Sequence, residues 1–284
     1  MRWMVVGGNG MLGRDVVDLV DGMPGQEVSS VDRDAVDIVD PGSVARTVTD
    51  VDVVVNCAAY TAVDAAESDE ATAFAVNAVG AANLARASRA VGARLVQIST
   101  DYVFGGDATE PYPAGAPIAP RSAYGRTKAA GEWAVRAETP DHLVVRTAWL
   151  YGQHGQCFPK TIARIAAERG GLDVVDDQVG QPTWTRDLAD QIVRLVVGEA
   201  PAGTYHGTSS GVTSWCGFAR AVVAAAGLDP EIVRPTTSAA SERAATRPAY
   251  SVLGHGEVAA AGVDPIGAWD ERWAEAAPAV LGLG

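Results

Sequence analysis

Tyr124 and Lys128 are the two residues of this sequence whose types and spacing most clearly indicate chemistry. They stand four positions apart, so a helix through them would carry the phenol and the ammonium group on one face. A phenol with its ordinary pKa of about 10 exchanges protons poorly at neutral pH. A nearby cation stabilises the phenolate and lowers that pKa. We therefore expect Tyr124 to exchange a proton with a carbonyl or an alcohol, although an ordinary amphipathic helix would show the same spacing.

A hydroxyl-bearing segment is the second chemical feature. Ser99 ends a predicted strand at 94–99 and is followed by Thr100, Asp101 and Tyr102. Doubly wound sheets bind their ligands at the carboxyl ends of their strands. A hydroxyl of Thr100 there would hydrogen-bond a substrate carbonyl while Tyr124 delivers the proton. The sequence does not fix which of the two hydroxyls points inward, and a strand end followed by a helix cap is the alternative.

A glycine-rich loop near the N-terminus predicts a dinucleotide site. It lies between a predicted strand at 3–6 and a predicted helix at 11–20. Glycine permits a sharp turn and lets backbone N–H groups approach a pyrophosphate, to which the helix N-terminus adds its positive dipole end. The residues expected to contact the cofactor here are Gly7, Asn9, Gly10, Met11, Leu12 and Gly13.

Asp32 follows the second predicted strand, at 27–31, and bears on the choice of cofactor. A carboxylate at this position accepts hydrogen bonds from the adenosine ribose and repels a 2′-phosphate, which favours NAD. Arg33 beside it would pair with such a phosphate, so NADP stays open. Asp37 and Ile38 are expected beside the adenine, with a solvated loop as the alternative. The small residues Cys57, Ala58 and Ala59 after the third strand would let the backbone pass close to the cofactor.

Strand and helix patterns alternate along the first half of the chain, which predicts an α/β fold with a doubly wound parallel sheet. Continuous apolar strands such as 51–56 fit a sheet covered on both faces. We expect a dinucleotide-binding Rossmann domain over 1–150 and a smaller substrate-binding lobe over 151–284, with a strand and a helix near 185–207 returning to the sheet. Long helices are expected at 71–91 and 123–138, and the C-terminal tail is not assigned.

Composition excludes several classes of protein. The net charge of −13 argues against a nucleic-acid partner. The three cysteines and four histidines lack metal-ligand spacing, so we expect no metal site and a reducing cytoplasm. No signal peptide or membrane-spanning run is evident, so no membrane partner is expected.

Blocks of residues along the chain resemble the dTDP-4-dehydrorhamnose reductase family of the extended short-chain dehydrogenase/reductase superfamily. The broad resemblance rests on the glycine loop, Ser-Thr-Asp-Tyr-Val-Phe at 99–104 and Tyr-Gly-x-Thr-Lys at 124–128. The narrower one rests on the segments 56–64, 67–68, 146–152, 158–161, 177–183 and 247–248.

The resemblance implies a role for each matching residue. Thr100, Tyr124 and Lys128 would be the catalytic set, with Tyr124 and Lys128 also contacting the cofactor. Lys160 and Arg247 would hold the nucleotide diphosphate, since a dianion needs fixed donors; a solvated lysine and a surface arginine are the alternatives. The residues expected to line the sugar pocket are Thr61, Val63, Asp101, Tyr102 and Trp149.

The implied reaction is the NADPH- or NADH-dependent reduction of the 4-keto group of a dTDP-4-keto-6-deoxy sugar, by an enzyme that is expected to be a homodimer. Cys157 stands where relatives often have asparagine, and this departure leaves the particular sugar open. Another deoxysugar or a dihydrostreptose-type sugar of a natural-product pathway is the alternative substrate. A dehydratase or epimerase of the same superfamily is a further alternative; dehydratases typically carry an acidic residue where Tyr102 stands, and both recycle their cofactor instead of consuming it. A non-catalytic regulatory subunit would be expected to lack Tyr124 and Lys128.

Overall fold

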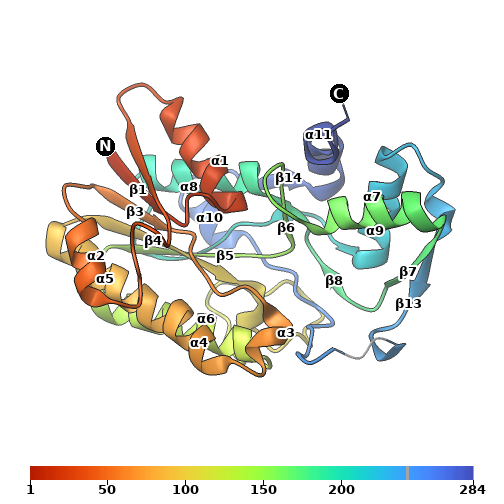
Figure 1. Cartoon of the computed structure of the whole chain (residues 1–284), viewed down its shortest axis with the longest axis horizontal. Helices are drawn as coiled ribbons and strands as arrows, with labels where there is room; N and C mark the ends of the chain where they lie inside the picture. Colours follow the sequence, from red (N-terminus) through yellow and green to blue (C-terminus); the bar gives the residue numbers. More distant parts are fainter. Residues whose placement is uncertain (241–242, 284) are drawn as a thin grey trace.

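A six-stranded parallel sheet forms the centre of the computed structural model, which describes residues 1–240 and 243–283 (Figure 1). The strand order is β10-β5-β4-β3-β1-β2, so the chain moves outward from β1 to β2 and then returns to β3 on the other side of β1. This reversal is the point at which doubly wound sheets open a ligand crevice. It confirms the predicted fold class. The strands are β1 (Arg2–Val6), β2 (Glu27–Val31), β3 (Val53–Asn56), β4 (Arg94–Thr100), β5 (His142–Thr147) and β10 (Gly203–His206).

Alternating side chains of the strands face two separate hydrophobic cores. Val5 and Val55 pack with α1 (Met11–Asp21) and α8 (Thr185–Val197) on one face. Val6 and Val54 pack on the other face with α2 (Pro41–Thr47), α5 (Ala81–Val91) and α6 (Ala123–Glu138). Figure 1 shows these two helix layers above and below the sheet. Burial on both faces explains why the strands are continuous apolar runs rather than alternating ones.

The helix predicted over 71–91 is interrupted. Its first part is α4 (Glu70–Phe74), its middle is a π-helical segment, η1 (Ala75–Gly80), and its last part is α5. Asn77 in the π segment accepts a hydrogen bond from the Tyr60 amide at 2.9 Å and donates one to Thr127 Oγ1 at 3.0 Å. Segments of π-helix are frequent at functional sites. Here the widened turn connects the segment before α3 (Val63–Ala66) to α6.

Most residues after β5 form a smaller group of elements beside the sheet (Figure 1). Its hydrophobic core includes Tyr151, Phe218 and Trp273. β10 and α8 nevertheless belong to the main sheet and its cover, and the division into two domains near residue 150 stays a prediction. The elements are β6 (Leu150–Tyr151), α7 (Phe158–Arg169), β7 (Leu172–Val175), β8 (Val179–Gly180), β9 (Thr183–Trp184), β11 (Ser209–Ser210), β12 (Thr213–Ser214), α9 (Trp215–Ala225), η3 (Pro230–Ile232), β13 (Val233–Thr236), η4 (Ser238–Ala240), β14 (Ile266–Ala268) and α11 (Trp269–Leu281). The short helix α10 (Gly256–Ala260) packs instead on the core of the main sheet through Val258.

The C-terminal tail, which the sequence analysis left unassigned, contains α10, β14 and α11. Trp273 and Val280 of α11 are buried in the smaller core. Within residues 1–240 and 243–283, no helix has the length and apolar character that crossing a membrane requires. The same residues contain no group of three or more His, Cys, Asp or Glu side chains arranged to hold a metal ion.

Candidate active site

The glycine loop between β1 and α1 is held tightly against its neighbours. Gly7 has a φ of +78°, and its amide donates to the Val31 carbonyl at 2.8 Å. A Cβ on Gly13 would lie 2.3 Å from the Gly7 carbonyl oxygen. Gly10 is the N-cap of α1 and supplies no capping side chain, so the first amides of the helix have no side-chain partner there. The loop therefore fits a pyrophosphate, which needs close backbone approach and free amides.

The end of β2 lies directly beside this loop. Asp32 Oδ2 accepts a hydrogen bond from the Asn9 amide at 3.0 Å, which fixes the carboxylate beside the loop. Arg33 and Asp37 are exposed. Ile38 is buried and packs against Val44 and Val54 in the hydrophobic core. Its carbonyl accepts a hydrogen bond from Asn83, so Ile38 has a packing role in addition to any contact with adenine.

The segment after β3 lies against the glycine loop. A Cβ on Gly7 would lie 2.8 Å from the Ala58 amide nitrogen, which shows how closely the two backbones pass. The Ala58 amide donates to Asn56 Oδ1 at 3.1 Å. Burial raises the pKa of the Cys57 thiol to about 12, with the charge of Lys128 acting in the opposite direction. Cys57 is therefore an inert, neutral side chain beside Lys128.

Thr100 ends β4 and shares its hydroxyl between several groups. Its Oγ1 donates to Asp101 Oδ1 at 2.8 Å and accepts a hydrogen bond from the Tyr102 amide at 3.2 Å. Asp101 is buried, which raises the pKa of its carboxyl to about 6. Ser99 points elsewhere, because its hydroxyl donates to Glu132 Oε1 at 2.6 Å. The contacts thus distinguish the two hydroxyls that the sequence left open.

The start of α6 delivers Tyr124 to this strand end. Ser122 caps the helix by accepting a hydrogen bond from the Gly125 amide at 3.1 Å. A Cβ on Gly125 would lie 2.3 Å from the Tyr102 carbonyl oxygen, so glycine after Tyr124 permits the first turn to touch the η2 segment (Asp101–Val103). The rings of Tyr102 and Tyr124 contact edge to face, with centroids 5.6 Å apart.

The pKa of Tyr124 is shifted in the direction opposite to that expected from the sequence. Burial raises it, the negative charge of Asp101 raises it further, and the Thr100 hydroxyl only partly offsets both. Lys128 does not counteract this shift, because its ammonium group donates to the Ile98 carbonyl at 2.6 Å instead of to the phenol. The expectation of an acidified phenol was wrong for this state of the protein. A neutral phenol is nevertheless the form that donates a proton.

Lys128 is a buried cation held under the site. Burial lowers its pKa to about 8, while the negative charge of Glu132 acts to raise it. Its side chain is 4% exposed, which excludes a solvated surface lysine. Buried titratable groups with shifted pKa values are concentrated at functional sites.

Trp149 contacts the smaller group of elements. Its φ of +47° lies in the left-handed region that non-glycine residues rarely adopt, and such strained residues cluster at ligand sites. Its ring stacks on Trp215 with centroids 3.7 Å apart. A Cβ on Gly180 would overlap the indole, so Trp149 is fixed from two sides. Sequence reasoning did not identify Trp215, since a lone aromatic residue before a helix carries no distinguishing pattern.

The two residues expected to hold a diphosphate differ in their surroundings. Arg247 donates to Asp64 Oδ2 at 2.7 Å and acts on the pKa of Tyr102, so it lies near the site. Lys160 donates to the carbonyls of Gln153 and Gly155 at 2.6 and 2.8 Å, which fixes the loop before its own helix. Thr61 is exposed and Val63 half-buried in the segment that leads into α3.

The contacts therefore join Thr100, Asp101, Tyr102, Tyr124 and Lys128 at the carboxyl end of β4. A doubly wound sheet with a glycine loop at its switch point defines the class: a Rossmann-type dinucleotide-binding protein with a Thr, Tyr and Lys set typical of short-chain dehydrogenases/reductases.

Comparison with known proteins narrows this class. The family described as the RmlD substrate binding domain matches residues 1–281. A dTDP-4-dehydrorhamnose reductase from Streptomyces griseus is 48% identical over 288 residues, which cover 99% of this chain and 94% of the relative. A probable dTDP-4,6-dihydroxy-2-methyloxan-3-one 4-ketoreductase from Streptomyces antibioticus is 46% identical, with 99% of this chain and 96% of the relative covered. The crystal structure of dTDP-4-dehydrorhamnose reductase from Bacillus anthracis in complex with NADP has a TM-score of 0.92 and 37% identity, covering 97% of this chain and 98% of that one.

The chain belongs to the RmlD substrate binding domain family. This confirms the family resemblance that the sequence motifs indicated.

Proposed function

We propose that the protein reduces the 4-keto group of a dTDP-linked 6-deoxyhexose with NADPH or NADH, as in the conversion of dTDP-4-dehydrorhamnose to dTDP-rhamnose. The observation that carries the proposal is that Thr100, Tyr124 and Lys128 gather at the carboxyl end of β4, the same edge of the parallel sheet at which the glycine loop follows β1. The names of the Streptomyces griseus and Bacillus anthracis proteins support this reaction, and the NADP in the latter supports the cofactor.

The residues of this chain would divide the chemistry between them. The bound nicotinamide supplies a hydride to C4 of the sugar. Tyr124, neutral because burial raises its pKa, donates a proton to the oxygen that becomes the alcohol. The positive charge of Lys128 stabilises the phenolate that remains on Tyr124, and its ammonium group hydrogen-bonds the nicotinamide ribose. Gly7 and Gly13 hold the pyrophosphate by close backbone contact.

Thr100 has one hydroxyl proton, which limits its role. In the structure that proton is donated to Asp101. To polarise a substrate carbonyl, the hydroxyl must rotate away from Asp101 or Asp101 must be protonated. The pKa of Asp101, raised by burial to about 6, makes protonation accessible near neutral pH.

A panel of dTDP-4-keto sugars, each assayed with NADH and with NADPH, tests the proposal. Stoichiometric oxidation of the cofactor is expected with at least one sugar, because a reductase consumes its hydride donor. Turnover without net oxidation would instead indicate a dehydratase or epimerase. The Streptomyces antibioticus relative, named for a different keto sugar, is the observation that favours including natural-product sugars in the panel.

Asp32→Ser is expected to raise the affinity for NADPH relative to NADH by about tenfold, since it removes a carboxylate that would face the 2′-phosphate. Dissociation constants measured by quenching of protein fluorescence check this ratio. Asp34→Ser, two residues further on and exposed, is the matched control and should leave the ratio unchanged. An unchanged ratio in the Asp32 variant would assign cofactor choice to another residue.

Arg247→Met is expected to raise KM for the dTDP-sugar by about 10- to 100-fold with kcat nearly unchanged, because a diphosphate contact is made equally in the ground and transition states. Initial-rate kinetics separate the two constants. Arg234→Met removes an exposed arginine paired with Asp173 and serves as the control. A fall in kcat alone would contradict the diphosphate role.

The proposal also includes a reducing cytoplasm, in line with the free thiols of Cys57, Cys157 and Cys216. The homodimer expected from the sequence stays a prediction, which light scattering on the purified protein tests.

A further inference from the structure

Glu132 is a fully buried carboxylate in the helix that carries Tyr124 and Lys128. Tyr124, Lys128, Glu132 and Arg136 follow one another at intervals of four, so they form one stripe along α6. Glu132 is 0% exposed, and no role proposed above uses it. Charged side chains are almost never buried in this way unless they are paired.

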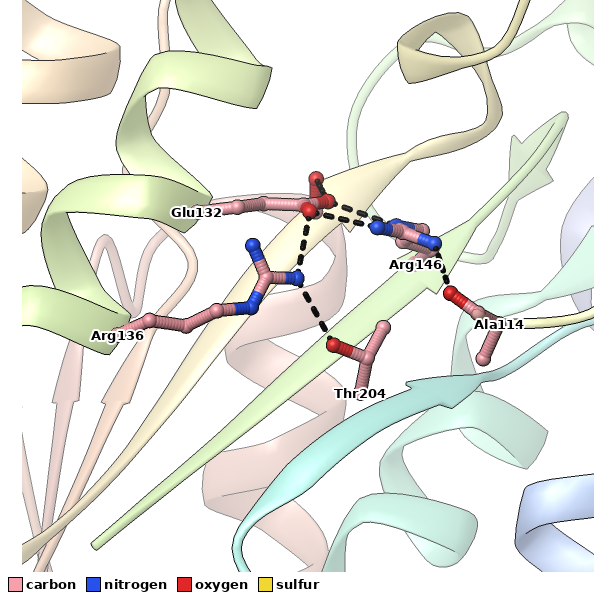
Figure 2. A network of polar contacts seen from close by, with 6 residues as sticks. Ala114, Glu132, Arg136, Arg146 and Thr204 are labelled. Carbon is pink, nitrogen blue, oxygen red and sulfur yellow. Dashed lines mark hydrogen bonds and ion pairs between the residues drawn. The ribbon is translucent and has the colours of Figure 1, made fainter. Parts of the chain in front are cut away.

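Both oxygens of Glu132 are fully used (Figure 2). Oε1 accepts hydrogen bonds from Ser99 Oγ at 2.6 Å and Arg146 Nε at 2.8 Å. Oε2 accepts from Arg146 Nη2 at 2.7 Å and Arg136 Nη2 at 3.0 Å. Arg146, itself 2% exposed, thus forms the two-pronged pairing that fixes both distance and orientation.

The hydrogen bonds of Glu132, Arg136 and Arg146 connect β4 and α6, the two elements that carry the catalytic set, to β5 and β10. Arg146 lies in β5 and also donates to the Ala114 carbonyl at 2.9 Å. Arg136 donates to Thr204 Oγ1 of β10 at 2.9 Å. Ser99 lies in β4 directly before Thr100. Figure 2 shows the carboxylate between the helix and the strands. Glu132 therefore ties the strand end that bears Thr100 to the helix that bears Tyr124 and Lys128.

Stability alone does not explain such a pair. Replacing a buried ion pair by apolar residues of similar size is often neutral or stabilising in proteins, so burial of the pair is weak evidence for a role in stability. A network in which every partner is satisfied is rigid, because each hydrogen bond restricts the others. Thus a need for fixed geometry accounts for this network better than a need for stability.

The charges that face Glu132 come from all the elements packed on it. The cations Arg146 of β5 and Arg136 and Lys128 of α6 surround it, together with the Ser99 hydroxyl. His206 of β10 also faces it, but burial lowers the pKa of this imidazole to about 4 and keeps it neutral. Burial would raise the pKa of Glu132, but the bonds and charge of Arg146, with help from Ser99 and Arg136, hold it below its usual value. Glu132 therefore stays ionised, and its charge favours the protonated form of Lys128.

We propose that Glu132, clamped by Arg146, is a positioning residue of the reductase site: it holds the Ser99–Thr100 strand end in register with Tyr124 and keeps Lys128 cationic. This inference rests on the proposed function for its kinetic part only.

The two lysines of the chain permit a test that needs no substrate. With 13Cε-labelled lysine, the protein gives signals only from Lys128 and Lys160, and Lys160→Arg assigns them. The midpoint of Lys128 is expected to fall by at least about half a pH unit in Glu132→Gln, since a nearby negative charge is removed. Glu138→Gln, at the other end of α6 and paired with Arg86, is the matched control and should leave the midpoint unchanged. An unchanged midpoint in Glu132→Gln would overturn the electrostatic part of the proposal.

The kinetic test uses Ser99→Ala, which deletes a single hydrogen bond, and the double variant Glu132→Met/Arg146→Met, which removes both charges. For variants with wild-type circular dichroism, we expect kcat to fall about 100-fold in the double variant and less in Ser99→Ala, with the NADPH dissociation constant within about threefold of wild type. A folded double variant with wild-type kcat would show that the pair only supports the fold. If the wild-type protein reduces no keto sugar, the proposed function fails, while the lysine titration still decides the electrostatic part.

Discussion

Tyr124→Phe is expected to lower kcat by about 10³-fold and to leave NADPH affinity nearly unchanged. Proton transfer by a positioned side chain contributes about 10²–10⁴-fold to a rate. The ring of phenylalanine keeps the edge-to-face contact with Tyr102, so the variant loses the hydroxyl and little else. Single-turnover kinetics measure the chemical step, and fluorescence titration measures cofactor binding.

Tyr205→Phe is the control for this substitution. Tyr205 lies in β10, away from Thr100 and Lys128. Its hydroxyl donates to the Pro201 carbonyl at 2.7 Å. Losing one such hydrogen bond costs about 1 kcal/mol of stability, and kcat should not change. Retention of turnover in Tyr124→Phe would refute the assignment of the proton donor, since no other hydroxyl in the chain is given that role.

Gly13→Ala is the second substitution with a large expected effect, here on the cofactor. The added Cβ would lie 2.3 Å from the Gly7 carbonyl oxygen and 2.7 Å from Gly8 Cα, and both neighbours are backbone atoms. Because backbone cannot yield as a side chain does, the loop must open. Overpacking of this kind costs about 1–3 kcal/mol. If this cost falls entirely on binding, the NADPH dissociation constant rises by about 5- to 150-fold.

Isothermal titration calorimetry and thermal unfolding measure both consequences for Gly13→Ala. Gly256→Ala is the control, because a Cβ there meets nothing within 4 Å, and the residue begins α10. It should leave NADPH binding unchanged. Unaltered affinity in Gly13→Ala would mean that the pyrophosphate does not depend on the close contact between Gly13 and Gly7.

The sequence predicted the fold because its strongest patterns are local. The continuous apolar strand ending at Asn56 and the helix over 123–138 depend on neighbouring residues alone. The π-helical turn at Asn77 was missed, since an alanine-rich segment has the same periodicity whether or not the ladder of hydrogen bonds widens. Several strands of the smaller group, such as Val179–Gly180, are only two residues long and leave almost no periodic signal.

Site residues could be named from the sequence, but their electrostatics could not. The four-residue spacing of Tyr124 and Lys128 predicts that both side chains lie on one face of a helix, but it does not predict how deeply they are buried. Burial reverses the shift expected for the phenol and turns the lysine toward a backbone carbonyl. Glu132 and Arg146 were missed for the same reason, because their pairing depends on two elements that are adjacent only in the folded sheet.

The position of β10 affects whether one half of the sequence can be exchanged by recombination without loss of folding. This strand comes from the second half of the sequence, yet it completes the main sheet beside β5, and α8 covers the same face as α1. The two halves are therefore interleaved rather than appended. A fragment ending near residue 150 would expose the edge of β5 and the apolar side of α1. Duplication, fusion or exchange of the N-terminal half by recombination would therefore produce a protein that folds poorly, whereas exchange of a separate domain would not.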